Sequence, residues 1–375
     1  MGRRVVQIHF LFLSAVVCYA MEERDSASAT PRGKAPSNQS RKSYGRSRRS
    51  LGVELTNIGF TPGHLAGLRA PTSRELPKPR NLTEHVNPEQ IALLVKNEWK
   101  LSYITPLYQF RHTQLKTYSK QLSAFIAAEK QQGLAVEIEA DTSFRVTFSA
   151  VLGLAETEDD AETVFIQIHS RPPFAVEGDA PKVIWSGWLT CINGNPEYLR
   201  SLPSGFVCLP LFCTSGSESL TSVVKLWFEK TFDCNFGTLS LNSTCLQWLA
   251  SMWTGCHPAF NIRYLKLVWN LPAQPPLDIS YTIHPQDAWD LWNSIREQDS
   301  AADTISINEV ESFMKGLEAH FFRHFRIYLS AGTLTKVSTT FGSAHCDGKI
   351  KFTSGDSIKH VLMLLTEYAL LKMPI

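Results

Sequence analysis

The sequence lacks the patterns that mark most enzymes and metal sites. None of its eight cysteines pairs in the short C-x-x-C spacing of a zinc or redox site, and no nucleophile elbow, phosphate-binding loop or dinucleotide fingerprint is present. His320 and His324 have a helical spacing that suits a metal, but Phe321 and Phe322 lie between them and no general base follows the first histidine. We therefore interpret the pair as packing or as a surface histidine pair, and we predict no catalytic residue, no metal and no cofactor.

Long apolar runs are equally scarce. Beyond residue 20 no stretch approaches the roughly 18 consecutive apolar residues of a membrane span, so we predict no membrane partner. Residues 1–20 do have the features of a secretory signal, because Arg3 and Arg4 precede an apolar run that ends at Cys18-Tyr19-Ala20. That local pattern predicts a secreted, disulfide-containing glycoprotein of unknown role.

The cysteines favour a different compartment. Removal of a signal would leave seven of them, and an odd number leaves one thiol unpaired. Cys191, Cys208, Cys213 and Cys245 lie in apolar runs, which is typical of buried thiols in a reducing compartment. The cysteines therefore argue against export.

Acidic residues are few at the beginning of the chain. The first 50 residues hold 10 Lys or Arg against 3 Asp or Glu, whereas residues 51–375 hold 27 against 32. Because residues 21–86 are rich in Ser, Pro, Gly and Arg, we predict a disordered basic tail there. Such a tail suits a polyanion, and a merely solvated tail is an equal alternative. Thr30 and Thr61 precede prolines and Ser50 follows a basic run, so these three are candidate phosphosites.

From residue 87 onward, helical and strand-like patterns alternate. We expect helices that begin at Pro88, near His112 and at Pro285, a helical block over 217–253, a capping box at Ser306 and Glu309, and a last helix near 358–371. Strand-like patterns cover 134–140, 144–154, 163–170, 182–192, 261–271, 277–283, 326–330, 333–345 and 349–354, with a hairpin turn at Asp347-Gly348. The order predicts an α+β fold of two mixed α/β halves, 87–256 and 257–375, with curved, mainly antiparallel sheets flanked by helices.

Three lysines near the C-terminus form the most informative charged group. Side chains alternate along a strand, so Lys349 and Lys351 project to one face, and Lys336 lies in the preceding strand pattern. Lysines on one face of a strand contact a phosphate backbone, or they protect a sheet edge against aggregation. Taken alone, the pattern slightly favours edge protection, and Lys336, Lys349 and Lys351 are the candidate DNA contacts.

Long, specific strings follow one another over residues 87–375. They include LSYITPLY (101–108), AFIAAEKQQGLAVEIEAD (124–141), WSGWL (185–189), FVCLPLF (206–212), WFEKTFDC (227–234), MWTGC (252–256), LDISYTIHPQDA (277–288), HFFRHFRIYLSA (320–331) and SAHCDGKIK (343–351). In these strings the chain resembles the centromere protein L family, whose members are subunits of the constitutive centromere-associated network of the inner kinetochore.

The resemblance implies a non-enzymatic scaffold in the nucleus, at the centromere and kinetochore. Such a subunit pairs with centromere protein N through its C-terminal region and helps to link the centromeric nucleosome and its DNA to centromere protein C and the H/I/K/M group. A nuclear role does not need a signal, so we hypothesise that residues 1–20 are a spurious upstream extension and that translation starts at Met21. The pairing residues that the resemblance suggests are Phe325, Arg326, Ile327, Tyr328, Leu329, Lys349, Ile350 and Phe352.

Overall fold

The computed structural model describes residues 4–9, 76–77, 88–131, 143–171, 182–255, 264–296, 304–355 and 358–374. Met1–Phe12 and Ala70–Ile375 form one unit, to which every described residue belongs. Most of the signal-like segment and of the tail, with Thr30, Ser50 and Thr61, falls outside the described residues. The expectations for these parts therefore stay predictions.

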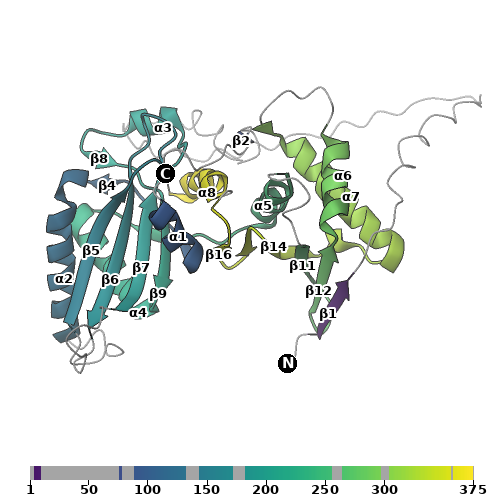
Figure 1. Ribbon diagram of the computed structural model, residues 1–375, viewed down its shortest axis with the longest axis horizontal. Coiled ribbons are helices and arrows are strands. Elements are labelled where there is room, and N and C mark those ends of the chain that lie inside the picture. Colours follow the sequence, from purple (N-terminus) through teal and green to yellow (C-terminus); the bar gives the residue numbers. More distant parts are fainter. Residues whose placement is uncertain are drawn as a thin grey trace, which may run out of the picture. The chain divides into compact units, whose positions relative to one another are not determined.

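One sheet of 12 strands runs through this unit in the order β1-β12-β11-β14-β15-β16-β3-β9-β7-β6-β5, and β10 also pairs with β3 (Figure 1). Among the described strands only β1 and β12 pair in parallel, and β13 with β2 and β4 with β8 form two small sheets. The strands are β1 (Arg4–His9), β2 (Leu76–Pro77), β3 (Glu98–Ile104), β4 (Leu107–Tyr108), β5 (Ser143–Val151), β6 (Thr163–Arg171), β7 (Lys182–Thr190), β8 (Phe206–Val207), β9 (Leu211–Gly216), β10 (Phe236–Thr238), β11 (Leu265–Leu271), β12 (Leu277–Ile283), β13 (Thr304–Ile305), β14 (Thr333–Thr339), β15 (Gly342–His345) and β16 (Lys349–Phe352).

The helices form where the sequence carries local start signals. They are α1 (Pro88–Lys96), α2 (Leu115–Gln131), α3 (Pro196–Ser201), α4 (Glu218–Phe232), α5 (Ser243–Gly255), α6 (Pro285–Ile295), α7 (Ile307–Phe325) and α8 (Ile358–Lys372), with 3-10 turns η4 (His112–Gln114) and η5 (Leu329–Ala331). The predicted starts at Pro88 and Pro285 are confirmed, since proline lacks only an N–H that the first turn does not use. The capping box is also formed: the Glu309 N–H donates to Ser306 Oγ, and the Ser306 N–H donates to the Glu309 carboxylate.

One local expectation was wrong. The segment 326–330 is not a strand, because Arg326 ends α7 in the left-handed conformation (φ 58°) and η5 follows. The apolar residues there connect a helix to β14, and Leu329 packs into the core. The helical block expected over 217–253 is present as α4 and α5, which are separated at Asp233 (φ 49°) and by β10. The strand pattern at 134–140 lies outside the described residues.

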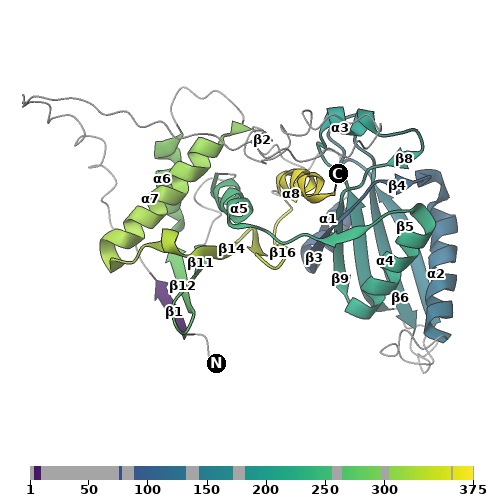
Figure 2. The same cartoon turned by 180° about the vertical axis from the view of Figure 1, so that it is seen from behind.

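The sheet separates two hydrophobic cores. The helices that cover them are labelled in Figure 2. On one face, α2 and α4 cover β5, β6, β7 and β9 with an aromatic core that includes Tyr118, Trp227 and Phe228. On the other face, α1, α5, α7 and α8 pack on a larger core that includes Trp99 and Phe352. The second core contains residues from both predicted halves, and its helices cover one face along most of the sheet.

The sheet also crosses the predicted boundary between residues 256 and 257. Strand β16 of the second half pairs with β3 of the first, with Ile350 opposite Trp99. The α+β prediction with mainly antiparallel strands is confirmed, and both halves contribute to one sheet. The division into domains at this boundary remains a prediction.

Candidate functional site

Strand alternation places Lys349 and Lys351 on the same exposed face of β16, as expected. Ile350 and Phe352, between and after them, are buried on the opposite face. Strand β16 lies between β15 and β3, and β14 lies between β11 and β15, so neither is an edge of the sheet. The edge-protection interpretation was therefore wrong, because an interior strand has no free backbone groups to guard.

The pairing register extends these lysines into a line of basic side chains. Lys336 of β14 lies opposite His345 of β15, His345 opposite Lys349 of β16, and Lys349 opposite Lys100 of β3. Directly paired residues point to the same face, and neighbouring strands lie about 4.8 Å apart. We call Lys336, His345, Lys349 and Lys100 the basic row, which spans roughly 14 Å across four strands.

A second line runs beside the basic row. Lys351 pairs with Ser343 of β15, which continues through Ser338 of β14 to Lys266 of β11. On the other side Lys351 lies opposite Glu98 of β3. The sequence analysis missed Lys100, Lys266 and His345, because their proximity depends on which strands pair and not on any local spacing.

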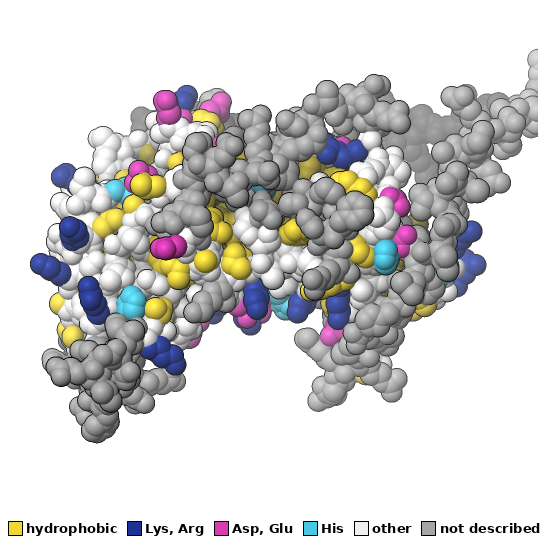
Figure 3. Space-filling view, viewed as in Figure 1, with side chains coloured by type: hydrophobic (Ala, Val, Ile, Leu, Met, Phe, Trp, Pro, Cys, Tyr) yellow, Lys and Arg dark blue, Asp and Glu magenta, His cyan; other side chains and the backbone are white. Residues whose placement is uncertain are grey.

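The basic row lies on a part of the sheet that none of the described helices covers. The basic row is on the same face of the sheet that α2 and α4 cover over β5, β6, β7 and β9. Lys100 lies close to the first turn of α4, where both carboxylate oxygens of Glu218 are 3.0 Å from Lys100 Nζ. The core helices α5 and α8 lie on the other side of β14 and β16 (Figure 1). Dark blue and cyan side chains gather below these strands in the space-filling view (Figure 3).

Acidic residues balance part of this charge. Asp347, in the turn between β15 and β16, lies 2.8 Å from His345 Nδ1 through Oδ1 and 3.1 Å from Lys349 Nζ through Oδ2. Partial burial by itself would raise the pKa of Asp347, but hydrogen bonds and charge from Lys349 and His345 lower it below its usual value. The hydrogen bond to Asp347 in turn raises the pKa of Lys349. Within the described part of the chain, Lys336 and Lys351 form no ion pair.

The suggested pairing residues divide into buried and exposed groups. Leu329, Ile350 and Phe352 are buried in the core, and Phe325 and Ile327 are half-buried against it. Arg326, Tyr328 and Lys349 are exposed. The sheet order separates the two stretches, since η5 packs near β11 whereas β14 and β15 lie between β11 and β16.

Tyr328 is the most exposed large hydrophobic residue of the described chain, at 62%. Its ring stacks on Phe322 of α7 at 4.1 Å between centroids, and the Arg326 guanidinium lies 5.7 Å from the Phe322 ring centre. We call Phe322, Arg326 and Tyr328 the aromatic patch. Aromatic and arginine side chains of this kind are the groups that most often anchor protein interfaces.

The histidine pair on α7 is engaged in packing. Tyr281 Oη and His320 Nδ1 form a hydrogen bond of 2.7 Å, and the rings of His320 and His324 lie 4.5 Å apart. Burial, together with the positive charge of His324 and Arg323, lowers the pKa of His320 to about 4. No group of three or more metal-ligating side chains occurs in the part of the chain that is described.

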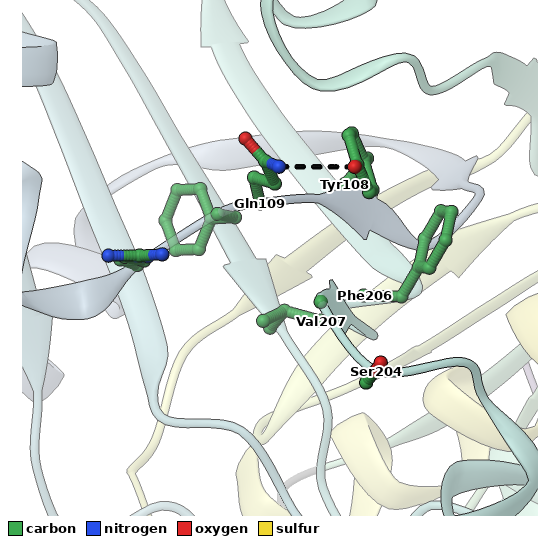
Figure 4. A pocket seen from close by; sticks show the side chains of 8 residues that line it. Tyr108, Gln109, Ser204, Phe206 and Val207 are labelled. Carbon is green, nitrogen blue, oxygen red and sulfur yellow. Dashed lines mark hydrogen bonds between the residues drawn. The ribbon is translucent and has the colours of Figure 1, made fainter.

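A shallow cavity of about 360 Å³ lies beside β4 and β8 (Figure 4). Tyr108, Gln109 and Arg111 line it on one side, and 204–207 line it on the other. Gln109 Nε2 donates a hydrogen bond of 3.1 Å to Tyr108 Oη, so the polar groups of the rim partly satisfy one another. Arg111 is the one charged residue in its lining, which does not resemble a catalytic arrangement.

Comparisons with known proteins point to one family. The family model for centromere protein L matches residues 93–370. The chain is 64% identical to centromere protein L of Danio rerio over 364 residues, which is 97% of this chain and 98% of that protein. The chain belongs to the centromere protein L family. It is also 41% identical to the Xenopus tropicalis member over 88% of this chain and 95% of that one, and 42% identical to the Homo sapiens member over 80% and 86%.

Membership of the centromere protein L family makes this chain a centromere protein and gives the secreted alternative no support. The cysteines agree, because the six in the described residues are free and five of them are buried. Burial raises the pKa of Cys213 and Cys245 to about 12, so these thiols stay protonated. None of the described helices is long and apolar enough to cross a membrane.

Proposed function

We propose that this centromere protein is a non-enzymatic scaffold subunit of the inner kinetochore. It pairs with centromere protein N, and together they link the centromeric nucleosome to other subunits, including centromere protein C and the H/I/K/M group. Family membership supports this role, and the basic row is the observation in the structure that carries it. Three lysines and one histidine stand on one open face of interior strands, where they serve neither the core nor an edge.

The basic row suits the phosphate backbone of DNA. Lysines spaced by neighbouring strands follow a line of phosphates without reading bases, and each phosphate contact releases condensed counterions. Lys336 and Lys351 have no ion pair within the described chain, so binding a phosphate would break no existing pair. A kinetochore scaffold needs affinity for chromatin more than for one sequence, and contacts to the backbone provide such affinity.

The DNA proposal is tested by charge reversal on the purified heterodimer with centromere protein N. We expect Lys336→Glu with Lys351→Glu to weaken binding to a labelled DNA duplex, and to reduce the dependence on salt by about one unit of slope per lost contact. Lys116→Glu with Lys120→Glu, on an exposed face of α2, is the matched control. Equal affinities of the two double variants would remove the open face of the sheet from the DNA site.

The aromatic patch supports the pairing with centromere protein N. Tyr328 and Arg326 are exposed, whereas the backbone beneath them is fixed by the hydrogen bond from the Arg326 N–H to the Phe322 carbonyl at 2.8 Å. A rigid aromatic side chain loses little conformational entropy when it binds, which favours its use as an interface anchor. The aromatic patch therefore offers a partner an accessible surface, whereas Leu329, Phe325 and Ile327 of the same stretch pack into or against the core.

Truncation of the patch tests this pairing. Tyr328→Ala should lower the affinity for centromere protein N by at least fivefold, because about 1 kcal/mol or more is typical of an aromatic anchor. Tyr108→Ala removes another exposed tyrosine, on β4, and should leave the affinity unchanged. Co-purification and titration of the two variants compare them directly. Full affinity of the Tyr328 variant would exclude the aromatic patch from the interface.

A further inference from the structure

Asp347 occupies an unusual position relative to the basic row. It lies in the β15–β16 turn and contacts two of the four side chains of the basic row at once, His345 through Oδ1 and Lys349 through Oδ2. The carboxylate is 43% exposed, as is the imidazole of His345, so an anion from solvent reaches the same groups. Within the described residues, Asp347 is the acid that bridges adjacent members of the basic row.

The turn itself does not need this negative charge. Gly348 has φ 84°, and a Cβ there would lie 2.3 Å from the Leu239 carbonyl oxygen, so glycine is required at that position. Asp347 Oδ1 also accepts the Lys349 N–H at 3.2 Å, which an asparagine carboxamide oxygen would do equally well. Asn-Gly and Asp-Gly are both favoured in tight hairpins. The backbone conformation of the hairpin thus allows asparagine or aspartate. The two residues differ in charge and in the second acceptor oxygen, which Asp347 places 3.1 Å from Lys349 Nζ.

We infer that Asp347 acts as an intramolecular competitor for the polyanion that the open face binds. The inference rests on the proposed function, and it concerns how strongly the basic row binds. A phosphate that approaches Lys349 must displace the Asp347 carboxylate or share the ammonium with it, and it meets the repulsion of that carboxylate at short range. The aspartate therefore holds Lys349 and His345 in place while it weakens the attraction of Lys349 for an external anion.

The other acids near the row do not have this geometry. Glu218 holds Lys100 alone, from the first turn of α4, and is 66% exposed. Glu98 lies opposite Lys351 in the second line of the sheet. Glu218 contacts Lys100 at the end of the basic row, and Glu98 faces Lys351 beside it, whereas Asp347 contacts the two middle members, His345 and Lys349. Substitution of Asp347 should accordingly have the largest effect of the three.

The test is Asp347→Asn in the heterodimer with centromere protein N, with a labelled DNA duplex as the probe. We expect binding to become roughly three- to tenfold tighter at low salt, and the dependence on salt to become steeper. Without the Asp347 carboxylate, Lys349 is free to neutralise a phosphate, and this contact releases cations condensed on the DNA. A merely structural role would not change the salt slope in this direction. Glu311→Gln is the matched control, since it removes one exposed carboxylate from the Lys315 pair on α7.

The outcomes separate the inference from the proposed function. If Asp347→Asn binds like the wild type while Lys336→Glu with Lys351→Glu weakens binding, the competitor inference is overturned and the DNA proposal stands. If neither variant changes binding, the DNA proposal fails and the inference fails with it. Equal tightening by Glu311→Gln would show a general effect of net charge and would also overturn the inference. A thermal melt of each variant verifies that the hairpin remains folded.

Discussion

The two faces of the central strands differ more than their sequences suggest. On β16, Ile350 and Phe352 pack against α5 and α8 in a closed core, while Lys349 and Lys351 face solvent on the other side. Farther along the sheet, β7 and β9 have helices on both faces, and most of their side chains are buried on both. Burial of apolar side chains on one face stabilises the sheet. The other face of β14, β15, β16 and β3 can therefore hold charged side chains that are exposed to solvent.

The largest expected effect comes from the closed face. Phe352→Ala removes a fully buried aromatic ring and should lower the free energy of unfolding by about 3–5 kcal/mol, because the cavity cannot collapse completely. Lys351→Ala, its neighbour on the open face, should change stability by less than about 0.5 kcal/mol. Urea unfolding, followed by tryptophan fluorescence, compares the two. Similar losses in both variants would contradict the assignment of faces.

A pair of carboxylates gives the second comparison. Asp160 is only 8% exposed, and its oxygens accept backbone N–H groups of Glu156, Thr157, Asn193 and Gly194 at 2.8–3.0 Å. These bonds join the loop before β6 to the loop after β7. The buried Asp160 carboxylate is therefore a structural group, whereas the exposed Asp347 carboxylate reduces the positive charge of the basic row.

Substitution to asparagine separates these two roles. Asp160→Asn should cost about 2–4 kcal/mol of stability, since an amide nitrogen would face backbone donors in a buried site. Asp347→Asn should cost less than about 0.5 kcal/mol, because its carboxylate is exposed to water. Differential scanning calorimetry measures both. A stable Asp160→Asn protein would show that the four N–H groups have other acceptors.

The smallest expected effect depends on pH. The pKa of His320 is lowered to about 4 in the folded chain, so the unfolded chain binds the proton more tightly. The resulting stability is present above pH 6.5 and is lost as the pH falls toward 4. Since His320 is partly exposed, we expect a loss of about 1 kcal/mol over this range. Urea titrations at several pH values should show that His320→Gln lowers this slope; an unchanged slope would assign it to other groups.

Local signals accounted for most elements of the fold. Pro88, Pro285 and the Ser306–Glu309 box marked helix starts, and period-two patterns marked β5, β6, β7, β11, β12, β14 and β16. The mistakes arose where apolar residues serve a connection, as at 326–330, which no periodicity distinguishes from a short strand. The candidate site was half predicted: Lys336, Lys349 and Lys351 lie on the open face, but Lys100 joins them from more than 200 residues away in the chain.

The sequence by itself determined most of the secondary structure, the family and the alternation of Lys349 and Lys351 with Ile350 and Phe352. These depend on short-range periods and on long strings of specific residues. Only the tertiary structure decided that β16 is an interior strand, that His345 and Lys100 complete the basic row, and that Asp347 bridges its centre. The physical reason is that strand pairing joins residues by register across the sheet, and a register between distant strands leaves no trace in local spacing.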